Sequence, residues 1–387
     1  MVLAAEGFIV ALVLAGLPAP TALAQQSAPD SAPPASDEAG SAQASDAGLA
    51  AFVRSIGVVG FVDAYYSYRF HPSSGDAQLR NFDTKHNQFS FNLAEIALER
   101  RPTTQSRLGF RLDFNVGPAT DMVHAAEPGG SGQFRNLQQG YVTYLAPLGR
   151  GLQIDVGKMV TPLGAEVIET KDNWNYSRSL LFALAIPYYH MGARVTYGFG
   201  DRFAIAGLIV NGWNNVVENN DRKSFGVQAT FKPTSKLSIV QGYMVGPEQT
   251  DDDEDIRQVS DTIVTYAAVS WLSLMANYDI GRDRVDGAPV QWQGVAAYAR
   301  VTATSWWAIS PRLEWYEDRD GFTTGVAQTI RGGTLTSEFK VDDQLFTRVE
   351  YRRDVSNRPF FANGSSRVKP QTTLTVGLFY VFSSPQR

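Results

Sequence analysis

The stretch LTVGLFYVF, residues 374–382, ends five residues before the C-terminus and alternates between two kinds of side chain. One face is polar or small, with Thr375 and Gly377. The other face is apolar and aromatic, and consists of Leu374, Val376, Leu378, Tyr380 and Phe382. An apolar outer face with an aromatic end is typical of the last strand of a bacterial outer-membrane barrel. We therefore expect the chain to lie in lipid, with Tyr380 and Phe382 as the signal for the barrel-assembly machinery.

The N-terminus favours export. Residues 7–17 form an apolar stretch of signal-peptide length, and Ala22-Leu23-Ala24 matches a cleavage pattern. One departure is that Glu6, and neither Lys nor Arg, precedes the apolar stretch. From residue 25 to about residue 51 the chain is rich in Ala, Ser, Pro, Gln and Asp and has no aromatic residue, so it cannot bury a core. We predict a signal peptide at 1–24, a flexible periplasmic linker at 25–56 and an outer-membrane barrel at 57–387.

Composition narrows the class of protein further. The chain has 387 residues, 44% of them hydrophobic and 12% aromatic, and no cysteine, which excludes thiol catalysis and thiolate metal sites. After the signal peptide no run of 18 apolar residues could form a transmembrane helix, so a spanning protein must be a barrel. Five acidic residues and one arginine precede residue 57, which leaves −1 of the formal charge of −5 for the barrel. A nucleic-acid surface is therefore not expected.

Strand-length segments from residue 57 onward can be counted, and the count is sixteen. Short connections alternate with longer ones, as short periplasmic turns and long outer loops do in an up-and-down antiparallel barrel. No repeat of 40 to 50 residues is present, which argues against a soluble propeller. The expected strands are 57–70, 87–100, 106–116, 133–146, 151–160, 187–199, 202–211, 223–232, 236–246, 258–269, 272–281, 289–302, 305–317, 328–339, 344–353 and 370–382.

Side-chain alternation assigns a lumen face to most of these strands. In 106–116, for example, Arg111 and Asp113 alternate with Leu112 and Phe114. The second strand changes phase after Leu93, and we predict a bulge near residues 94 and 95. Strands 133–146 and 258–269 show no clear phase, so their wet face stays unassigned.

Several segments together resemble the beta-barrel porin-2 family of OmpL-like outer-membrane proteins. They occur in the order of the family and span nearly the whole barrel. The resemblance implies an outer-membrane barrel and a porin, with the solute undefined and no catalytic residues. The segments are VGKMVTPLGAEV (156–167), NWNYSRSLLF (173–182), IPYYHMGARVTY (186–197), VNGWNN (210–215), GPE (246–248), RLEWYEDRDGF (312–322) and RVEYRRDVSN (348–357).

The longest expected connection, 161–186, is a candidate constriction loop. It is rich in aromatic and amide side chains rather than in Gly and Ser, and it contains Trp174, Arg178 and the apolar run 180–182. A loop with its own apolar content must bury it, and the barrel interior is the nearest shelter from water. The alternative is that the loop packs over the barrel rim.

Charged residues on the expected strands should face the lumen, because a charge on the lipid face costs roughly 2–4 kcal/mol at mid-bilayer. They could be ion pairs that stiffen a wet wall, or they could set a field across the narrowest part of the pore. The pore-lining candidates are Trp174, Arg178, His190, Arg194, Arg107, Arg111, Asp113, Arg312, Glu314, Arg348, Glu350 and Arg352.

Other functions have weaker support. His190 lacks a Ser nucleophile in a Gly-x-Ser-x-Gly segment, so we expect no enzyme, and no cofactor or metal site is predicted. The acidic run 251–255 is a solvated loop tip, or is bridged to lipopolysaccharide by divalent cations.

We expect a porin that passes small hydrophilic solutes passively, with outer-membrane lipid and lipopolysaccharide around it. Sixteen strands leave an aqueous channel, and no plug-sized domain precedes the barrel. The alternative is a non-conducting structural or adhesin-like surface barrel, which the modest size of the outer loops disfavours. The solute, the ion selectivity and the formation of a homo-oligomer remain open.

Overall fold

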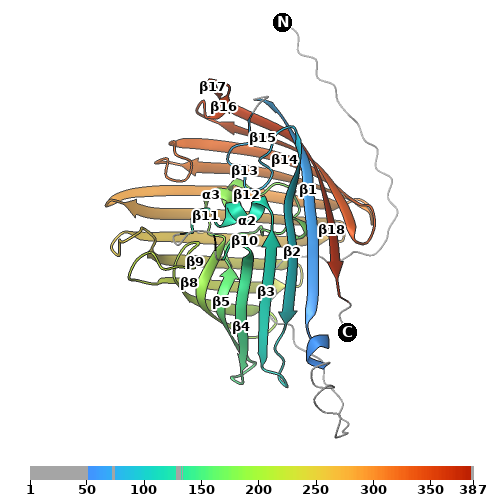
Figure 1. The fold of residues 1–387 in the computed structure, drawn as a ribbon, viewed down its shortest axis with the longest axis vertical. Helices are drawn as coiled ribbons and strands as arrows, with labels where there is room; N and C mark the ends of the chain where they lie inside the picture. The colour runs from blue at the N-terminus through green and yellow to red at the C-terminus, as the bar shows by residue number, and fades with distance from the viewer. Residues whose placement is uncertain (1–50, 72–74, 128–131, 133, 385–387) are drawn as a thin grey trace.

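The structure, a computed structural model, describes residues 51–71, 75–127, 132 and 134–384. Sixteen antiparallel strands close into a barrel, which confirms the expected fold class (Figure 1). The predicted signal peptide and residues 25–50 of the predicted linker lie outside the described residues. Residues 51–54 form a helical turn, in which the Phe52 ring lies 5.2 Å from the Arg100 guanidinium.

The barrel strands follow one another around the wall in chain order. They are β1 (Gly57–His71), β2 (Gln88–Arg100), β3 (Leu108–Val116), β4 (Leu137–Ala146), β5 (Leu152–Val160), β6 (Tyr189–Gly198), β7 (Phe203–Val210), β8 (Ser224–Thr234), β9 (Leu237–Pro247), β10 (Ile256–Val269), β11 (Leu272–Val285), β12 (Ala288–Thr302), β13 (Trp307–Asp318), β14 (Gln328–Lys340), β15 (Leu345–Ser356) and β18 (Pro370–Ser383).

The first and last strands close the barrel. β1 and β18 pair antiparallel from Val59 opposite Ser383 to His71 opposite Thr372. The Phe382 ring covers Gly60, because a Cβ atom at Gly60 would lie only 2.3 Å from it. Phe382 therefore packs on the seam between the two ends of the chain.

Replacing Phe382 with Ala should lower the yield of folded barrel. The substitution removes the ring that covers Gly60, and it does not alter the predicted signal peptide at 1–24. Folded protein can be measured as the heat-modifiable band on a gel, with total exported protein as the reference. Outer-membrane levels equal to those of the wild type would show that Tyr380 alone suffices.

The two strands without a clear phase are assigned by the structure. In β4 Val142 and Tyr144 are exposed on the outer wall, while Thr143 is buried on the inner side. In β10 Asp261 and Thr265 are buried. The phase of β10 was hidden because its outward positions include polar residues, namely Gln258, Ser260 and Thr262.

The bulge in β2 occurs earlier than we predicted. Asp63 pairs with Leu93 and Ala64 pairs with Phe91, so Asn92 is the extra residue. Leu93 is consequently buried, whereas Phe91 is exposed on the outer wall. The prediction at residues 94 and 95 was wrong because it counted Leu93 among the lipid-facing residues.

Two outer connections differ from the expected loops. The expected loop 282–288 is only a two-residue turn, because β11 continues to Val285 and β12 begins at Ala288. The two turn residues, Asp286 and Gly287, both have positive φ. The expected loop 354–369 contains a small hairpin of β16 (Phe361–Asn363) and β17 (Ser366–Val368).

Short helices lie in two other connections. α2 (Pro118–Val123) follows β3, and η1 (Thr170–Asp172) and α3 (Leu180–Leu184) lie between β5 and β6. Figure 1 places α2 and α3 between the front and back strands of the barrel. α3 begins after Ser179, whose hydroxyl accepts a hydrogen bond from the Phe182 N–H at 3.1 Å. Within the described ranges, no helix has the length and apolar content needed to span a membrane.

Candidate pore constriction

The connection between β5 and β6, which we call the inner segment (161–186), bonds to strands on several sides of the barrel. At its start the Pro162 carbonyl accepts a hydrogen bond from Gln228 on β8. The Gly164 N–H then donates to Asp261 at 3.0 Å, and the Ala165 N–H donates to Asn277 at 3.2 Å. This first part of the inner segment is therefore tied to β8, β10 and β11.

The second part of the inner segment is tied to β12, β13 and β15. Glu350 accepts hydrogen bonds from the N–H groups of Tyr176 (2.6 Å) and Ser177 (3.0 Å). Glu314 accepts one from the Leu180 N–H at 2.6 Å. The Trp292 indole donates to the Ala185 carbonyl at 3.2 Å. These backbone N–H groups have no backbone partner in a strand ladder. The Glu350 and Glu314 carboxylates therefore accept the hydrogen bonds that water would otherwise accept.

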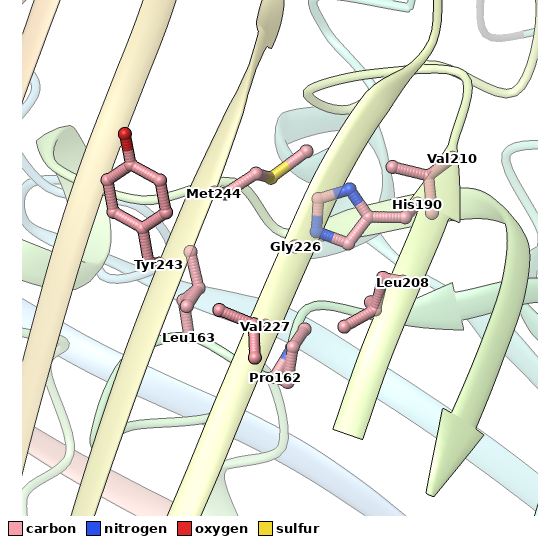
Figure 2. A pocket seen from close by; sticks show the side chains of 9 residues that line it. All are labelled: Pro162, Leu163, His190, Leu208, Val210, Gly226, Val227, Tyr243 and Met244. Carbon is pink, nitrogen blue, oxygen red and sulfur yellow. The ribbon is translucent and has the colours of Figure 1, made fainter. Parts of the chain in front are cut away.

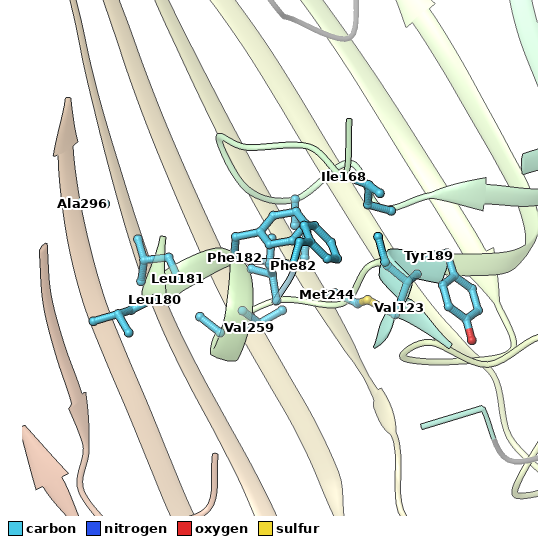
Figure 3. Close-up of a cluster of buried hydrophobic side chains, with 14 of the residues drawn as sticks. Phe82, Val123, Ile168, Leu180, Leu181, Phe182, Tyr189, Met244, Val259 and Ala296 are labelled. Atoms are coloured by element: carbon cyan, nitrogen blue, oxygen red, sulfur yellow. The ribbon is translucent and has the colours of Figure 1, made fainter. Parts of the chain in front are cut away.

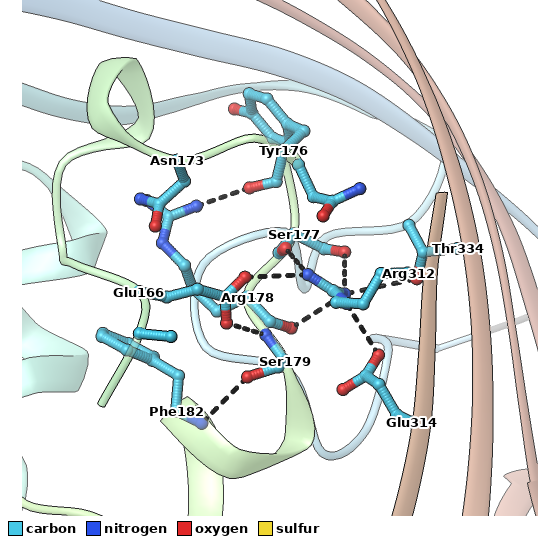
Figure 4. Close-up of polar contacts among 12 residues, drawn as sticks. Glu166, Asn173, Tyr176, Ser177, Arg178, Ser179, Phe182, Arg312, Glu314 and Thr334 are labelled. Atoms are coloured by element: carbon cyan, nitrogen blue, oxygen red, sulfur yellow. Dashed lines mark hydrogen bonds and ion pairs between the residues drawn. The ribbon is translucent and has the colours of Figure 1, made fainter. Parts of the chain in front are cut away.

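Three buried arginines on β13 and β15 donate to carbonyls of the inner segment (Figure 4 shows the first of them). Arg312 donates to the Ser177 carbonyl at 2.6 Å. Arg348 donates to the carbonyls of Thr170, Asn173 and Asn175, and Arg352 to that of Arg178.

Carboxylates balance the charge of these arginines. Arg312 pairs with Glu166 at 2.9 Å and with Glu314 at 2.8 Å. Arg348 pairs with Glu338, and Arg352 with Asp354. Removing one partner of a buried pair costs about 3–5 kcal/mol, because the other charge stays behind uncompensated. The charged wall and the inner segment therefore hold one another in place.

Arg178 braces the inner segment from within. Its guanidinium donates to the carbonyls of Val167 (2.7 Å) and Ile168 (2.6 Å) and is buried. Its own carbonyl accepts from Arg312 and Arg352, so the residue reaches the charged wall through its backbone. Burial lowers the pKa of Arg178 from its ordinary value.

Tyr176 links the inner segment to the barrel seam. Its hydroxyl donates to Asp63 on β1 at 2.9 Å, and its ring lies where a Cβ atom of Gly377 on β18 would stand, 2.2 Å away. Burial, together with the nearby Asp63 carboxylate, raises the pKa of Tyr176 well above its ordinary value. Glycine at 377 thus makes room for this ring.

The apolar part of the inner segment is buried, as its composition predicted. Leu180, Leu181 and Phe182 belong to one hydrophobic cluster with Ile168 and with Phe82 from the β1–β2 connection (Figure 3). The rings of Phe82 and Phe182 meet edge to face, with centroids 6.0 Å apart. Trp174 packs against this cluster and is only partly buried.

One edge of the inner segment remains open to solvent. It consists of partly exposed residues, namely Val167, Glu169, Lys171, Asp172 and Trp174. The Lys171 ammonium pairs with the Asp172 carboxylate and lies 5.8 Å from the Phe61 ring on β1. Glu169 lies close enough to Glu95 on β2 to interact with it electrostatically. This edge therefore lies toward the first strands of the barrel.

The inner wall near this edge carries charges that water can reach. The Arg111 side chain is 30% exposed and pairs with Asp113 at 2.9 Å. Arg194 on β6 pairs with Asp155 on β5, also at 2.9 Å, and lies 5.9 Å from the Tyr141 ring. The Asp172 side chain is 42% exposed and that of Lys171 17%. Arg111, Arg194 and the Lys171–Asp172 pair thus reach solvent in the lumen, whereas the Asp113 and Asp155 side chains are buried.

His190 and Arg107 lie apart from these groups. The ring nitrogens of His190 lie 2.9 Å from the Gly212 carbonyl and 3.1 Å from the Thr161 hydroxyl. His190 also borders a small, mostly apolar pocket, whose other lining residues include Leu208 and Met244 (Figure 2). Arg107 precedes β3 at the periplasmic end and donates to the Leu145 carbonyl at 3.0 Å.

Buried polar groups also meet beside β5. Lys158 on β5 donates to the carbonyl of Leu137 (2.7 Å) and to Nε2 of His124 (2.5 Å). Burial, together with the Lys158 ammonium, lowers the pKa of His124 to about 4. Lys171 and Asp172 were overlooked because no periodic pattern marks them. Among the described residues, no group of three or more His, Asp or Glu residues could hold a metal ion.

Barrel, charged inner wall and inner segment together define a porin of the bacterial outer membrane. Residues 55–382 match the model of the family described as Putative beta-barrel porin-2, OmpL-like, and the chain belongs to this family. This confirms the resemblance seen in the sequence and the expectation of a channel rather than an enzyme. A comparison with curated proteins finds no match.

Solved structures of outer-membrane proteins share the fold. The chain resembles an anion-selective porin from Comamonas acidovorans (10% identity, TM-score 0.58, covering 84% of this chain and 99% of that one). It also resembles the outer membrane channel DcaP of Acinetobacter baumannii (11%, 0.58, 84% and 97%). A third is OmpT of Vibrio cholerae in a trimer form (11%, 0.57, 84% and 99%).

Proposed function

We propose that the inner segment is the constriction of this porin, and that small hydrophilic solutes pass between its open edge and the wall of β2 to β6. The observation that carries this proposal is the division of the lumen charges into two groups. Arg312, Arg348 and Arg352 are buried against the inner segment, whereas Arg111 and Lys171 reach solvent. The first group serves to hold the constriction, and the second meets the solute.

Charges of both signs line this proposed path. Arg111 and Arg194 stand on the wall, and Glu169 and Asp172 stand on the open edge. In a narrow lumen such charges act over short distances and are screened less than at an open surface. A polar path of mixed sign suits passive diffusion of small hydrophilic solutes. A surface adhesin would have no need of a constriction held by so many buried ion pairs.

Export and surroundings are part of the proposal. Residues 1–24 act as a signal peptide that is cleaved after export, and residues 25–56 form a flexible periplasmic linker in front of the barrel. The barrel-assembly machinery recognises Tyr380 and Phe382 and inserts the barrel. Lipid and lipopolysaccharide surround the wall. A homo-oligomer is also proposed, since OmpT of Vibrio cholerae, which shares the fold, has a trimer form.

Lys171→Glu should shift the reversal potential in a salt gradient toward cation selectivity. The substitution exchanges a positive for a negative charge on the open edge, next to Asp172. Lys340→Glu is the matched control, because it makes the same charge change at the periplasmic end of β14, where Lys340 pairs with Asp343. Planar-bilayer recordings of refolded protein supply both values.

Two results would count against the proposal. Equal reversal potentials for Lys171→Glu and Lys340→Glu would place the open edge outside the solute path. A wild-type barrel that migrates as folded on a gel but shows no conductance step would favour the non-conducting surface barrel.

A further inference from the structure

Two exposed arginines stand next to each other on the outer wall of the barrel. Arg331 on β14 lies opposite Val355, and Arg353 on β15 lies opposite Gly333. Both side chains are exposed, and both alternate with buried, inward-facing neighbours. They are therefore diagonal neighbours on one face of the sheet, with Cα atoms about 7–8 Å apart.

This arginine pair has no acidic partner among the residues that the structure describes. Arg353 donates to the Thr372 hydroxyl at 3.0 Å, and neither guanidinium forms an ion pair there. The inward-facing arginines of β15 differ in this respect, because Arg348 and Arg352 each meet a carboxylate. Like charges side by side repel, so an anion from outside the chain would stabilise the pair.

The arginine pair lies in the outer part of the barrel wall, toward the extracellular ends of β14 and β15. Arg331 is eight residues from Phe339, which stacks with Trp306 and Trp307 at the periplasmic end. At 3.3 Å per residue and a tilt near 45°, this separation is about 19 Å along the membrane normal, so the Cα atom of Arg331 stands about 6 Å below the top of an apolar band that is about 25 Å tall. Trp315, an aromatic residue, lies opposite Arg331 on the same face of the sheet. Long arginine side chains can extend from here to the headgroups.

Apolar side chains continue the surface below the arginine pair. Leu313 is 68% exposed, Leu335 52% and Tyr351 46%. Gly333 lies opposite Leu313, and a Cβ atom there would meet only Leu313, at 4.0 Å, so the surface next to Arg353 is not crowded. The outer wall thus carries two guanidinium groups and, on their periplasmic side, apolar side chains against which acyl chains can pack.

We propose that Arg331 and Arg353 bind a phosphate group of lipopolysaccharide in the outer leaflet. The guanidinium geometry suits bidentate bonds to phosphate oxygens. The acyl chains of the same lipid lie against Leu313, Leu335 and Tyr351. Lipopolysaccharide is the occupant rather than a phospholipid, because the pair stands at the extracellular end of β14 and β15, which follow and precede outer loops.

The test is binding of purified lipopolysaccharide to the full-length, refolded barrel in detergent. The double variant Arg331→Gln/Arg353→Gln keeps side chains of similar size and removes both charges. The matched control is Arg101→Gln/Lys340→Gln, which removes two exposed charges at the periplasmic end. Probes are lipopolysaccharide, the same lipopolysaccharide after enzymatic removal of its phosphates, and phosphatidylglycerol in the same detergent.

Intact lipopolysaccharide should raise the thermal unfolding temperature of the wild type and of the control. In the double variant its apparent affinity should fall about tenfold, as expected for the loss of charged hydrogen bonds. Wild-type affinity in the double variant would overturn the proposal. So would an equal effect of dephosphorylated lipopolysaccharide, or equal binding of phosphatidylglycerol.

Discussion

Deleting residues 173–179 should raise the single-channel conductance severalfold. The deletion removes the carbonyls that Arg348 and Arg312 bind and the N–H groups that Glu350 accepts from. Without them the middle of the inner segment no longer spans the lumen, and the freed charges become hydrated in a wider channel. Current–voltage curves of the refolded variant measure the effect directly.

Deletion of residues 250–254 is the control for this experiment. It shortens an exposed outer connection by a similar length without touching the inner segment. Its conductance should equal that of the wild type. If the deletion of 173–179 also left conductance unchanged in a folded barrel, the inner segment would not limit flow.

Replacing Glu350 with Ala should release the inner segment from β15. Glu350 accepts from the N–H groups of Tyr176 and Ser177 and from the Thr336 hydroxyl. Its loss leaves the two buried N–H groups and the Thr336 hydroxyl without their acceptor, and each unsatisfied buried group costs about 1–3 kcal/mol. The strand ladders of the barrel are unaffected, so this loss falls on the inner segment. Hydrogen exchange at Tyr176 and Ser177 should accelerate, and the recorded current should become noisier.

Glu350→Gln separates charge from shape in this experiment. Its amide oxygen can still accept one backbone hydrogen bond, so exchange at Tyr176 and Ser177 should lie between wild type and Glu350→Ala. Glu99→Gln, on the half-exposed pair with Arg101, should leave exchange there unchanged. Protection in Glu350→Ala equal to that of the wild type would show that the arginines alone hold the inner segment.

Strand number and side-chain facing could be predicted because both are local properties. Alternation along 374–382 marks an outer face, since lipid on one side and water on the other select different side chains at every second position. The prediction failed where one residue interrupts the period, as Asn92 does in β2. It also missed the turn at Asp286 and Gly287, because the polar residues before it suggested a loop.

Partners of the charged residues could not be predicted in the same way. Alternation and the cost of a charge in lipid assign Arg312 and Arg348 to the inner face, whatever lies beside them. The groups that they bind are remote in sequence, since Ser177 is 135 residues from Arg312 and Asn173 is 175 residues from Arg348. Only the closed barrel brings such groups together.

The sequence by itself determined a sixteen-stranded outer-membrane barrel with charges inside, because strand facing depends on the solvent at each face and on the next few residues. The tertiary structure alone decided which of those charges are buried against the inner segment and which reach water. That division depends on the path of residues 161–186 across the lumen. Hydrogen bonds to strands from β8 to β15 set this path, and no local pattern encodes them.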